Sequence, residues 1–565
     1  MILSAVSLWK KYNTNTPLNV VESGAEEVDG KVFSSVHYSG HRVEDGVVRI
    51  YAQFCRPAGN GKRPAILLLP DAGQPIDREL ISYFADKGYA VLVPDYSGKR
   101  EGQETPYTVY PESISYGNYE RAKGLNGITD GKTTADQITW FEWTYVALYS
   151  LKYLKEREDI SQIGVVGIRK GGDIAWQTML SPDVKCGVPI NAVGWHSFMH
   201  VAKFGTNTAH DLSDEMHRYI AAVEAQSYAP SVRCPVLMLC SLRDKNFDCD
   251  RAYDTYSRIG CKDGNALVYS FKSGECIGPE SLTDMDLFLE KNLKGREIYV
   301  PDTLNISIKE SEKGLEMEVE CDKEGILEEA GIFYAEADVK TRSAYRDWHC
   351  IYKTQGRTVK NGRFTFEKKP FEGATAVFAY AYAKYINGFY VMSKITSKRL
   401  SNTDVNAVKS RMIFSGEELD IFTVANHEEY SIADVLLERE AMPKKQKGYG
   451  DIEGAYSMGG IKTYKISSPK YLPEENAMLE FDVYSKESQR LAVSVHVADV
   501  DHDEEVYTCA FRINGGGKWK RVIFNAGEFK AENGAPLKSF SQGSALSFEC
   551  FEEEKEFSVT NVLWL

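Results

Sequence analysis

Short, uninterrupted apolar runs alternate with amphipathic stretches over the first half of the chain. An apolar run of about four to eight residues is typical of a strand that is buried on both faces of a parallel sheet. Such runs stand at Ala65–Leu69, Ala90–Val93, Ile163–Val166, Pro235–Cys240 and Ala266–Phe271, and Val47–Phe54 alternates like an exposed strand. The helical patterns among them cover Asp77–Lys87, Thr139–Glu156, Gly171–Leu180 and Leu282–Asn292. Strands that alternate with helices predict a doubly wound, mostly parallel sheet.

The pattern changes near residue 298. Helical periods disappear and period-two alternation takes over, which predicts strands with one buried face. Between 306 and 397 the alternating segments are Leu315–Val319, Ile332–Ala335, Phe364–Phe366 and Ala374–Tyr385. Beyond 401 they include Leu479–Val483, Leu491–Val497 and Leu546–Phe548, with glycine turns at Gly459-Gly460 and Gly515–Gly517. We expect a small β-sandwich followed by a second all-β unit, a jelly roll.

These changes divide the 565 residues into three predicted domains. Residues 1–297 form the first, with an N-terminal extension and a lid-like insert at 100–138; residues 298–400 and 401–565 form the two β domains. Loops as long as this insert are usually functional. Its aromatic residues and those that follow either line a pocket or, more simply, pack in a lid and core: Tyr107, Tyr110, Tyr116, Tyr119, Trp140, Phe141 and Trp143.

Composition and charge exclude several classes of protein. The formal net charge is -14, whereas nucleic acid or anionic lipid would require a basic face. The 11 cysteines show no Cys-x-x-Cys pair and no metal-ligand spacing, so we expect reduced thiols and no metal. No window has the roughly 18 apolar residues of a membrane span, and the N-terminal stretch lacks the order of a signal peptide. We expect a cytoplasmic protein, although a secreted chain whose signal had been removed would look the same.

A glycine-rich turn joins a buried strand to a helix at residues 167–172. The strand Ile163–Val166 is followed by Gly167, Arg169 stands at the apex, and Gly171-Gly172 leads into a helix that is expected to open at Asp173. Small residues two before and two after the apex are what a tight, strained strand–turn–helix requires. This frame resembles the nucleophile elbow of the α/β-hydrolase superfamily, on the side of the dienelactone hydrolases and acetyl xylan esterases. The resemblance covers about half of the chain and implies the α/β-hydrolase fold.

The catalytic positions that this resemblance implies are largely substituted. Arg169 stands at the nucleophile position, where a protonated guanidinium has no lone pair with which to attack. Asp244 stands at the acid position, with Asp248 as the alternative. Cys276 stands where the family has a histidine, and no histidine lies between Asp244 and residue 297. Two of the three implied catalytic residues are therefore replaced.

The loop that would supply the oxyanion site is also altered. It reads Pro70–Gln74 after the first apolar run, and its Asp71 brings a negative charge to the place where an oxyanion would form. We take Asp71 and Lys170 as candidate substrate-binding residues. Without a histidine, Asp244 would be a buried carboxylate with no partner, which is costly. We therefore predict an ion pair between Arg169 and Asp244, which makes the site a structural plug or an anion pocket.

Other residues could still supply catalysis. Four histidines follow Gly194-Trp195 in a segment that could cap the pocket, and one of them could act as a base: His196, His200, His210 and His217. Cys276 could act as a nucleophile if a nearby base lowered its pKa. The simpler interpretation is that these histidines are exposed or pack in a lid.

The two β domains carry looser resemblances. Ser343–His349, followed by strands, is similar to the immunoglobulin-like domain appended to some bacterial hydrolase-fold proteins. The last domain resembles galactose-binding-like jelly rolls, including carbohydrate-binding modules, at Gly459–Tyr464, Leu479–Val483, Gly517–Trp519, Phe529-Lys530 and Asn561–Leu565. Sugar binding needs exposed aromatic rings. Tyr507 and Trp519 are the candidates, the alternative being that both are core or inter-domain residues.

Three functions stay open on the sequence alone. The first is a pseudo-hydrolase with a binding or scaffolding role. The second is an active esterase that acts on an acylated carbohydrate or a small ester through non-standard residues. The third is a carbohydrate-binding protein whose first domain is a platform. None of them implies a cofactor, the expected partner is a small-molecule ester or a carbohydrate ligand, and the oligomeric state is not determined by the sequence.

Overall fold

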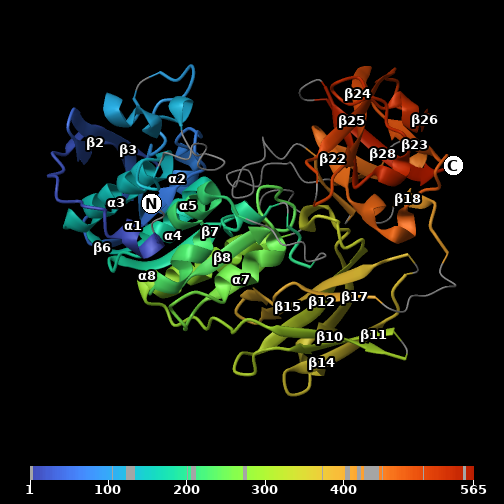
Figure 1. Ribbon diagram of the computed structural model, residues 1–565, viewed down its shortest axis with the longest axis horizontal. Helices are drawn as coiled ribbons and strands as arrows, with labels where there is room; N and C mark the ends of the chain where they lie inside the picture. The colour runs from blue at the N-terminus through green and yellow to red at the C-terminus, as the bar shows by residue number, and fades with distance from the viewer. Residues whose placement is uncertain are drawn as a thin grey trace.

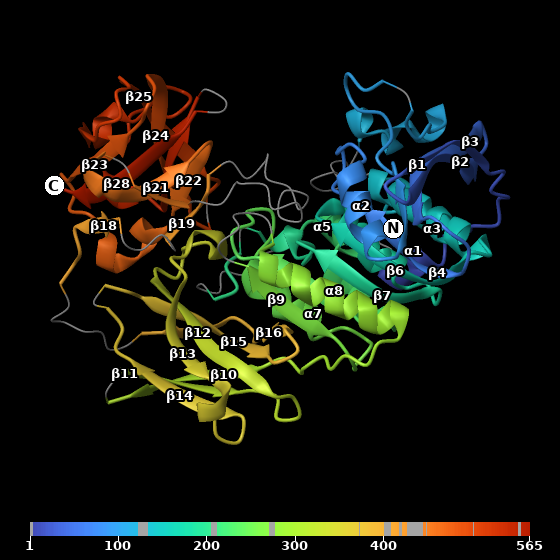
Figure 2. The same ribbon diagram turned by 180° about the vertical axis from the view of Figure 1, so that it is seen from behind.

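The computed structural model describes most of the chain. The described residues are 4–104, 106–122, 134–199, 201–204, 212–270, 277–312, 314–371, 373–400, 408–416, 421–425, 444–447, 449–500, 502–551 and 555–565. Figure 1 and Figure 2 show an α/β region in blue to green, a β region in yellow and a β region in orange to red. We call these the N-terminal, middle and C-terminal regions.

A nine-stranded sheet is the scaffold of the N-terminal region, with the order β1-β2-β3-β5-β4-β6-β7-β8-β9. Its strands are β1 (Val21–Val28), β2 (Lys31–Val43), β3 (Gly46–Pro57), β4 (Arg63–Leu69), β5 (Ala90–Pro94), β6 (Ile160–Ile168), β7 (Val184–Ile190), β8 (Leu237–Ser241) and β9 (Ala266–Ser270). The pairs β1-β2, β2-β3 and β3-β5 are antiparallel, and the others are parallel. The predicted mostly parallel α/β sheet is therefore present.

Helices cover both faces of this sheet. They are α1 (Ala5–Trp9), α2 (Arg78–Asp86), α3 (Thr139–Glu156), α4 (Lys170–Thr178), α5 (Asp214–Ala222), α6 (Ala225–Tyr228), α7 (Ala252–Tyr256) and α8 (Pro279–Lys294). In β6, the Cβ direction of Gly164 points to Leu293 of α8, whereas that of Gly167 points to Ala175 of α4. Positions three apart in a strand face opposite sides of a sheet, so α8 and α4 lie on opposite faces.

Two expectations for this region are wrong. Val47–Phe54 belongs to β3, which pairs with β2 and β5 and is largely buried. It does not behave as an exposed strand because β1 and β2, which lie before residue 45, extend the sheet beyond it. The helix after the elbow begins at Lys170, one residue before the helical pattern Gly171–Leu180 and three residues before the expected opening at Asp173.

The middle region consists of two sheets, with the orders β10-β11-β14 and β13-β12-β15-β16, and β17 pairs with β15. Its strands are β10 (Asn305–Ser311), β11 (Gly314–Glu320), β12 (Leu327–Ala337), β13 (His349–Gln355), β14 (Arg363–Lys368), β15 (Ala376–Tyr385), β16 (Tyr390–Met392) and β17 (Thr396–Arg399). Most of its buried apolar residues belong to the same core cluster as those of the N-terminal region, whereas Ala344 and Tyr345 cluster with Tyr464, Ala498 and Ala545 of the C-terminal region. The N-terminal and middle regions therefore pack as one body.

The C-terminal region also has two sheets, with the orders β19-β22-β27-β24-β25 and β20-β21-β28-β23-β26, and β18 pairs with β28. Its strands are β18 (Met412–Phe414), β19 (Phe422–Val424), β20 (Lys444–Lys447), β21 (Glu453–Ser457), β22 (Gly460–Thr463), β23 (Met478–Tyr484), β24 (Gln489–Val497), β25 (Glu505–Ile513), β26 (Lys520–Asn525), β27 (Ala545–Cys550) and β28 (Phe557–Trp564). These sheets enclose a separate apolar core. In the described parts of the chain, no helix has both the length and the apolarity to cross a membrane.

Candidate functional site

Arg169 occupies the apex of the turn between β6 and α4. Its backbone has φ 50° and ψ -113°, a conformation that residues with a side chain rarely adopt. Its N–H donates to the carbonyl of Ile190 at 2.8 Å, and its own carbonyl accepts from the N–H of Asp173 at 3.0 Å. These two bonds hold the strained apex between the neighbouring strand and the new helix.

Close packing explains the three glycines around the apex. An added Cβ would lie 2.4 Å from the carbonyl oxygen of Gly171 if placed on Gly167, and 2.1 Å from that of Leu69 if placed on Gly171. On Gly172 it would lie 2.5 Å from the Cβ of Ala192. None of these positions has room for a side chain. The glycine frame recognised in the sequence is thus a packing requirement of the turn.

The predicted ion pair between Arg169 and Asp244 is present. Nη2 of Arg169 lies 3.6 Å from Oδ2 of Asp244, and the arginine side chain is 27% exposed whereas the aspartate is 1% exposed. The other oxygen of Asp244 accepts from the backbone N–H and the side-chain amide of Asn246, at 2.8 and 2.9 Å. A buried carboxylate is therefore held by two hydrogen bonds and faces a half-exposed guanidinium.

Asp71 binds to the two backbone groups that would form an oxyanion site. Its Oδ1 accepts from the N–H of Ala72 at 2.9 Å and from the N–H of Lys170 at 3.2 Å. The ammonium of Lys170 lies 3.9 Å from the same oxygen. In α/β-hydrolases the oxyanion donors are the N–H after the nucleophile and an N–H from a strand–helix loop. Lys170 follows the apex residue and Ala72 lies in the loop after β4, so a carboxylate of the protein itself binds two N–H groups that correspond in position to those donors.

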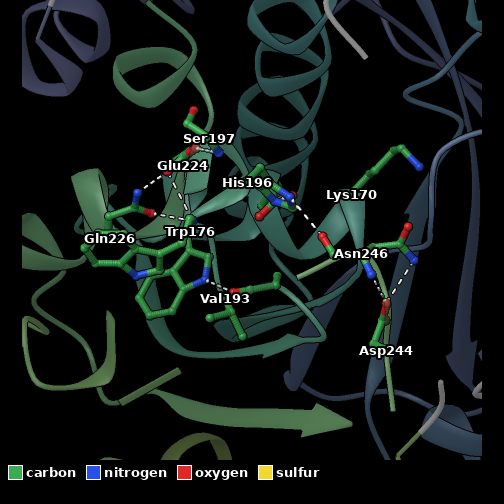
Figure 3. Close-up of polar contacts among 12 residues, drawn as sticks. Lys170, Trp176, Val193, His196, Ser197, Glu224, Gln226, Asp244 and Asn246 are labelled. Carbon is green, nitrogen blue, oxygen red and sulfur yellow. Dashed lines mark hydrogen bonds and ion pairs between the residues drawn. The ribbon is translucent and has the colours of Figure 1, made fainter. Parts of the chain in front are cut away.

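His196 and Asp173 form a third pair beside the elbow. Nε2 of His196 lies 3.5 Å from Oδ2 of Asp173, and its Nδ1 is 3.2 Å from the carbonyl oxygen of Asn246. Burial lowers the pKa of His196, but the hydrogen bond and charge of Asp173 outweigh it, so this pKa is raised. Figure 3 shows His196 pointing toward Asn246, which in turn contacts Asp244. His196 is therefore connected through Asn246 to the acid of the elbow pair.

A buried glutamate fixes the segment that carries His196. Glu224 is fully buried and accepts from the backbone N–H groups of Trp195, at 3.1 Å, and Ser197, at 2.7 Å. Its carboxylate also accepts from the side chain of Gln226 (Figure 3). Because the residues on both sides of His196 are bound in this way, the imidazole is held in place over the start of α4.

The elbow thus contains three cation–carboxylate pairs. They are Arg169 with Asp244, Lys170 with Asp71, and His196 with Asp173, at 3.6, 3.9 and 3.5 Å. Each cation has an acid beside it, and the charge of the buried Glu224 also acts on His196. The guanidinium of Arg169 offers no nucleophile at the apex, whereas a histidine paired with a carboxylate can orient or deprotonate water.

The other predicted residues either lie outside the described part of the chain or have other surroundings. Cys276, His200 and His210 lie outside the described residues, and His217 is exposed on α5. Asp248, the alternative acid, caps the short turn at Cys249–Arg251. The sequence did not single out Asp173 or Asn246. Their only signal is position, one in the first turn after the elbow and the other beside the predicted acid.

The aromatic residues near the insert pack instead of lining an open pocket. Trp140 and Trp143 are 1% and 0% exposed, and the ring of Tyr119 lies against Gly73, where an added Cβ would approach it to 2.7 Å. Tyr107 and Tyr116 are partly buried. Residues 105 and 123–133 of the insert lie outside the described residues. The described aromatic residues follow the simpler interpretation.

The two candidate sugar-binding aromatics belong to different parts of the C-terminal region. The hydroxyl of Tyr507, on β25, donates to Glu505 at 2.6 Å. Trp519 precedes β26, and its ring centre lies 5.5 Å from that of Tyr484. Since β25 and β26 belong to different sheets, the two rings are not brought together on one sheet face.

Comparisons with known proteins place the N-terminal region. Residues 50–272 match the model of the Dienelactone hydrolase family. A comparison with curated protein sequences finds no match. Similar solved structures include an acetyl xylan esterase from Paenibacillus sp., with 16% identity, 51% of this chain and 92% of that chain covered, and a TM-score of 0.38. Acetyl xylan esterase 1 from Thermoanaerobacterium sp. has 15% identity, 51% and 93% coverage and a TM-score of 0.38.

These TM-scores are below 0.5, so the assignment rests on the family match together with the sheet and the elbow. The match contains β4 to β9, the apex at Arg169 and the acid position at Asp244. The N-terminal region is an α/β-hydrolase-like domain.

Proposed function

We propose that the N-terminal domain has a binding or scaffolding role and does not hydrolyse esters. The observation that carries this proposal is that the Asp71 carboxylate accepts hydrogen bonds from the backbone N–H groups of Ala72 and Lys170. In acyl transfer these donors stabilise the negative charge that develops on the substrate oxygen. A fixed carboxylate at that position uses the donors and repels the developing charge.

The apex residue supports the same proposal. Arg169 keeps the strained backbone of a nucleophile elbow, yet it presents a guanidinium that pairs with Asp244. Strained backbone costs on the order of 1–3 kcal/mol and persists where the surroundings enforce it. In this chain the strained backbone presents the guanidinium of Arg169, and a cation at this position suits the binding of an anionic group.

A second candidate function is esterase activity through His196. Its pairing with Asp173 beside the elbow is the observation that favours it. A histidine held by a carboxylate can act as a general base toward water. The raised pKa of His196 works against this role, because it favours the protonated imidazole, which cannot accept a proton.

Hydrolysis of p-nitrophenyl acetate separates the two candidates. The binding proposal expects the same background rate from the wild type, from His196→Ala and from the matched control His217→Ala, which changes an exposed histidine. Turnover by the wild type that disappears in His196→Ala and persists in His217→Ala would establish the esterase.

The role of Asp71 has its own test in the same assay. The variant Arg169→Ser with Cys276→His restores the implied nucleophile and base. We expect it to hydrolyse the ester only when Asp71→Gly is added, since only then are both amides open to an oxyanion. Equal activity with and without Asp71→Gly would remove the main support for the proposal.

We also propose that the middle region is an immunoglobulin-like β-sandwich and the C-terminal region a galactose-binding-like jelly roll. Each has two sheets with antiparallel pairing, which supports the sandwich and jelly-roll architectures expected from the strand pattern. Sugar binding is not part of this proposal, because Tyr507 and Trp519 do not share a sheet. Glycan binding that is lost on Trp519→Ala would reinstate it.

A further inference from the structure

The segment Ser241–Arg251, which follows β8, carries the acid position of the elbow. Within it, Asp244 faces Arg169 at 3.6 Å. Its second oxygen binds the backbone and side-chain amides of Asn246 (Figure 3), which fixes the carboxylate relative to its own loop. We call Ser241–Arg251 the acid loop. A displacement of Asp244 must therefore move the neighbouring residues of this loop.

The residue before Asp244 binds both β regions. Arg243 is 4% exposed, and its Nη1 donates to the carbonyls of Ala344 and Arg346 in the middle region, at 3.1 and 2.5 Å. Its guanidinium carbon also lies 3.9 Å from the ring centre of Tyr464 in the C-terminal region. A buried cation stacked on an aromatic ring and bonded to two carbonyls is a strong, directional contact.

The residue after Asp244 binds the C-terminal region. The ammonium of Lys245 lies 2.8 Å from Glu504. Glu504 also accepts from Nδ1 of His496 on β24 at 2.5 Å, and lies 3.5 Å from the ammonium of Lys462 on β22. The acid loop thus reaches a buried polar cluster that joins the strands of the five-stranded sheet.

This cluster resembles a serine–histidine–acid relay, but its surroundings indicate a structural role. Nε2 of His496 lies 3.0 Å from the hydroxyl of Ser547. However, Ser547 is 0% exposed and its hydroxyl donates to Glu549 at 2.8 Å. A nucleophile must be accessible to its substrate, whereas Ser547 is buried within the C-terminal region. The cluster therefore serves to attach the C-terminal region.

We propose that Arg243, Asp244 and Lys245 link the elbow to the C-terminal region, so that a small anion that draws Arg169 away from Asp244 loosens the attachment of that region. The choice of an anion rests on the proposed binding function, because only a negative group competes with Asp244 for the guanidinium. The link itself rests on three consecutive residues, whose Cα atoms are about 3.8 Å apart. Each of them has a separate partner, and the Arg243 and Asp244 side chains are buried.

Hydrogen exchange in the full chain tests the link. We expect Arg169→Gln to speed the exchange of the β22 and β24 amides by roughly tenfold, in the range of typical coupling between sites. The matched control is Arg121→Gln, which removes an exposed pair with Glu112 at 3.2 Å and should leave these amides unchanged. If Arg169→Gln affects only α4 and its surroundings, the link is wrong.

A second variant separates the link from general damage to the domain. Lys245→Gln removes the ion pair with Glu504 directly, so it should speed the hydrogen exchange of the β22 and β24 amides and leave that of the α4 amides unchanged. Unchanged β24 amides in this variant would also overturn the link. Titration of the wild type with acetate tests the anion: faster exchange in β24 supports it. An effect of Arg169→Gln without any effect of acetate would retain the link and refute the anion, and with it the proposed binding of anions.

Discussion

The elbow and the junction with the middle region pair their charges in different ways. At the elbow the cations Arg169, Lys170 and His196 are 27%, 31% and 26% exposed, and their distances to the acids are 3.5 to 3.9 Å. At the junction, Arg346 and Asp250 are 2% and 3% exposed. There two guanidinium nitrogens donate to the two carboxylate oxygens at 2.5 and 2.7 Å.

This difference predicts that the ion pair at the junction contributes more to the stability of the fold than an exposed ion pair does. An exposed ion pair contributes about 0–1 kcal/mol, whereas the loss of one partner from a buried pair costs about 3–5 kcal/mol because a buried charge is left behind. The junction should therefore hold the N-terminal and middle regions together. At the elbow the cations are partly exposed, so an anion can reach them from solvent, whereas Asp244 and Asp173 are 1% and 4% exposed and still need a partner.

The largest effect is expected at the junction. Asp250→Ala should lower the free energy of unfolding by about 3–5 kcal/mol, since it leaves the guanidinium of Arg346 buried without its carboxylate. Urea unfolding measures this loss. The matched control is Lys353→Ala, which removes a 62% exposed lysine from its pair with Glu329 and should change stability by less than about 1 kcal/mol. Equal effects of the two variants would abolish the distinction drawn above.

An intermediate effect is expected from pH at the attachment of the C-terminal region. Burial, followed by the charge of Lys462, lowers the pKa of His496 to about 4, whereas an unfolded histidine has a pKa near 6.5. The folded state therefore resists protonation, and stability is full above pH 6.5 and falls as the pH drops toward 4. The charged and polar groups that face His496 are Lys462, Glu504, Lys245 and Ser547.

The expected size is roughly 2 kcal/mol between pH 7.5 and 5. Glu504 does not contribute over this range, because its own pKa is lowered: although burial raises it, His496 and Lys462 outweigh burial. Exchange of the β24 amides at the two pH values measures the change. In His496→Gln the pH dependence should flatten, and a variant that kept the full slope would contradict the assignment to this histidine.

The smallest effect is expected at the elbow itself. Lys170→Gln removes an ammonium that lies 3.9 Å from Asp71 and is 31% exposed, so the unfolding free energy should change by less than about 1 kcal/mol. The backbone N–H of residue 170 still donates to Asp71 in this variant. Thermal unfolding of Lys170→Gln and Asp250→Ala, measured in parallel, compares the two losses of stability. A loss in Lys170→Gln that approaches that of Asp250→Ala would show that the elbow is as rigid as the junction.

The sequence predicted the α/β sheet and the elbow because their signals are local. Runs such as Ile163–Val166 and the helix Thr139–Glu156 carry their periodicity within one segment, and α3 has the predicted bounds. Three strands of this sheet were missed: β1 (Val21–Val28) is wholly exposed, β2 (Lys31–Val43) mixes polar and apolar residues, and β7 (Val184–Ile190) has its apolar run broken by Lys185, Gly187 and Pro189. The start of α4 was placed too late, because glycines in a first helical turn have no helical signal of their own.

What the sequence alone determined about this protein is the frame: glycines at 167, 171 and 172 that admit no side chain, and an arginine between them. Only the tertiary structure decided how the charges pair. Asp71 meets the amide of Lys170 across 99 residues, and Asp250 meets Arg346 across 96. Such partners are determined by the topology that brings distant loops to one edge of the sheet, whereas the glycine spacing of the turn is visible within one short segment of the sequence.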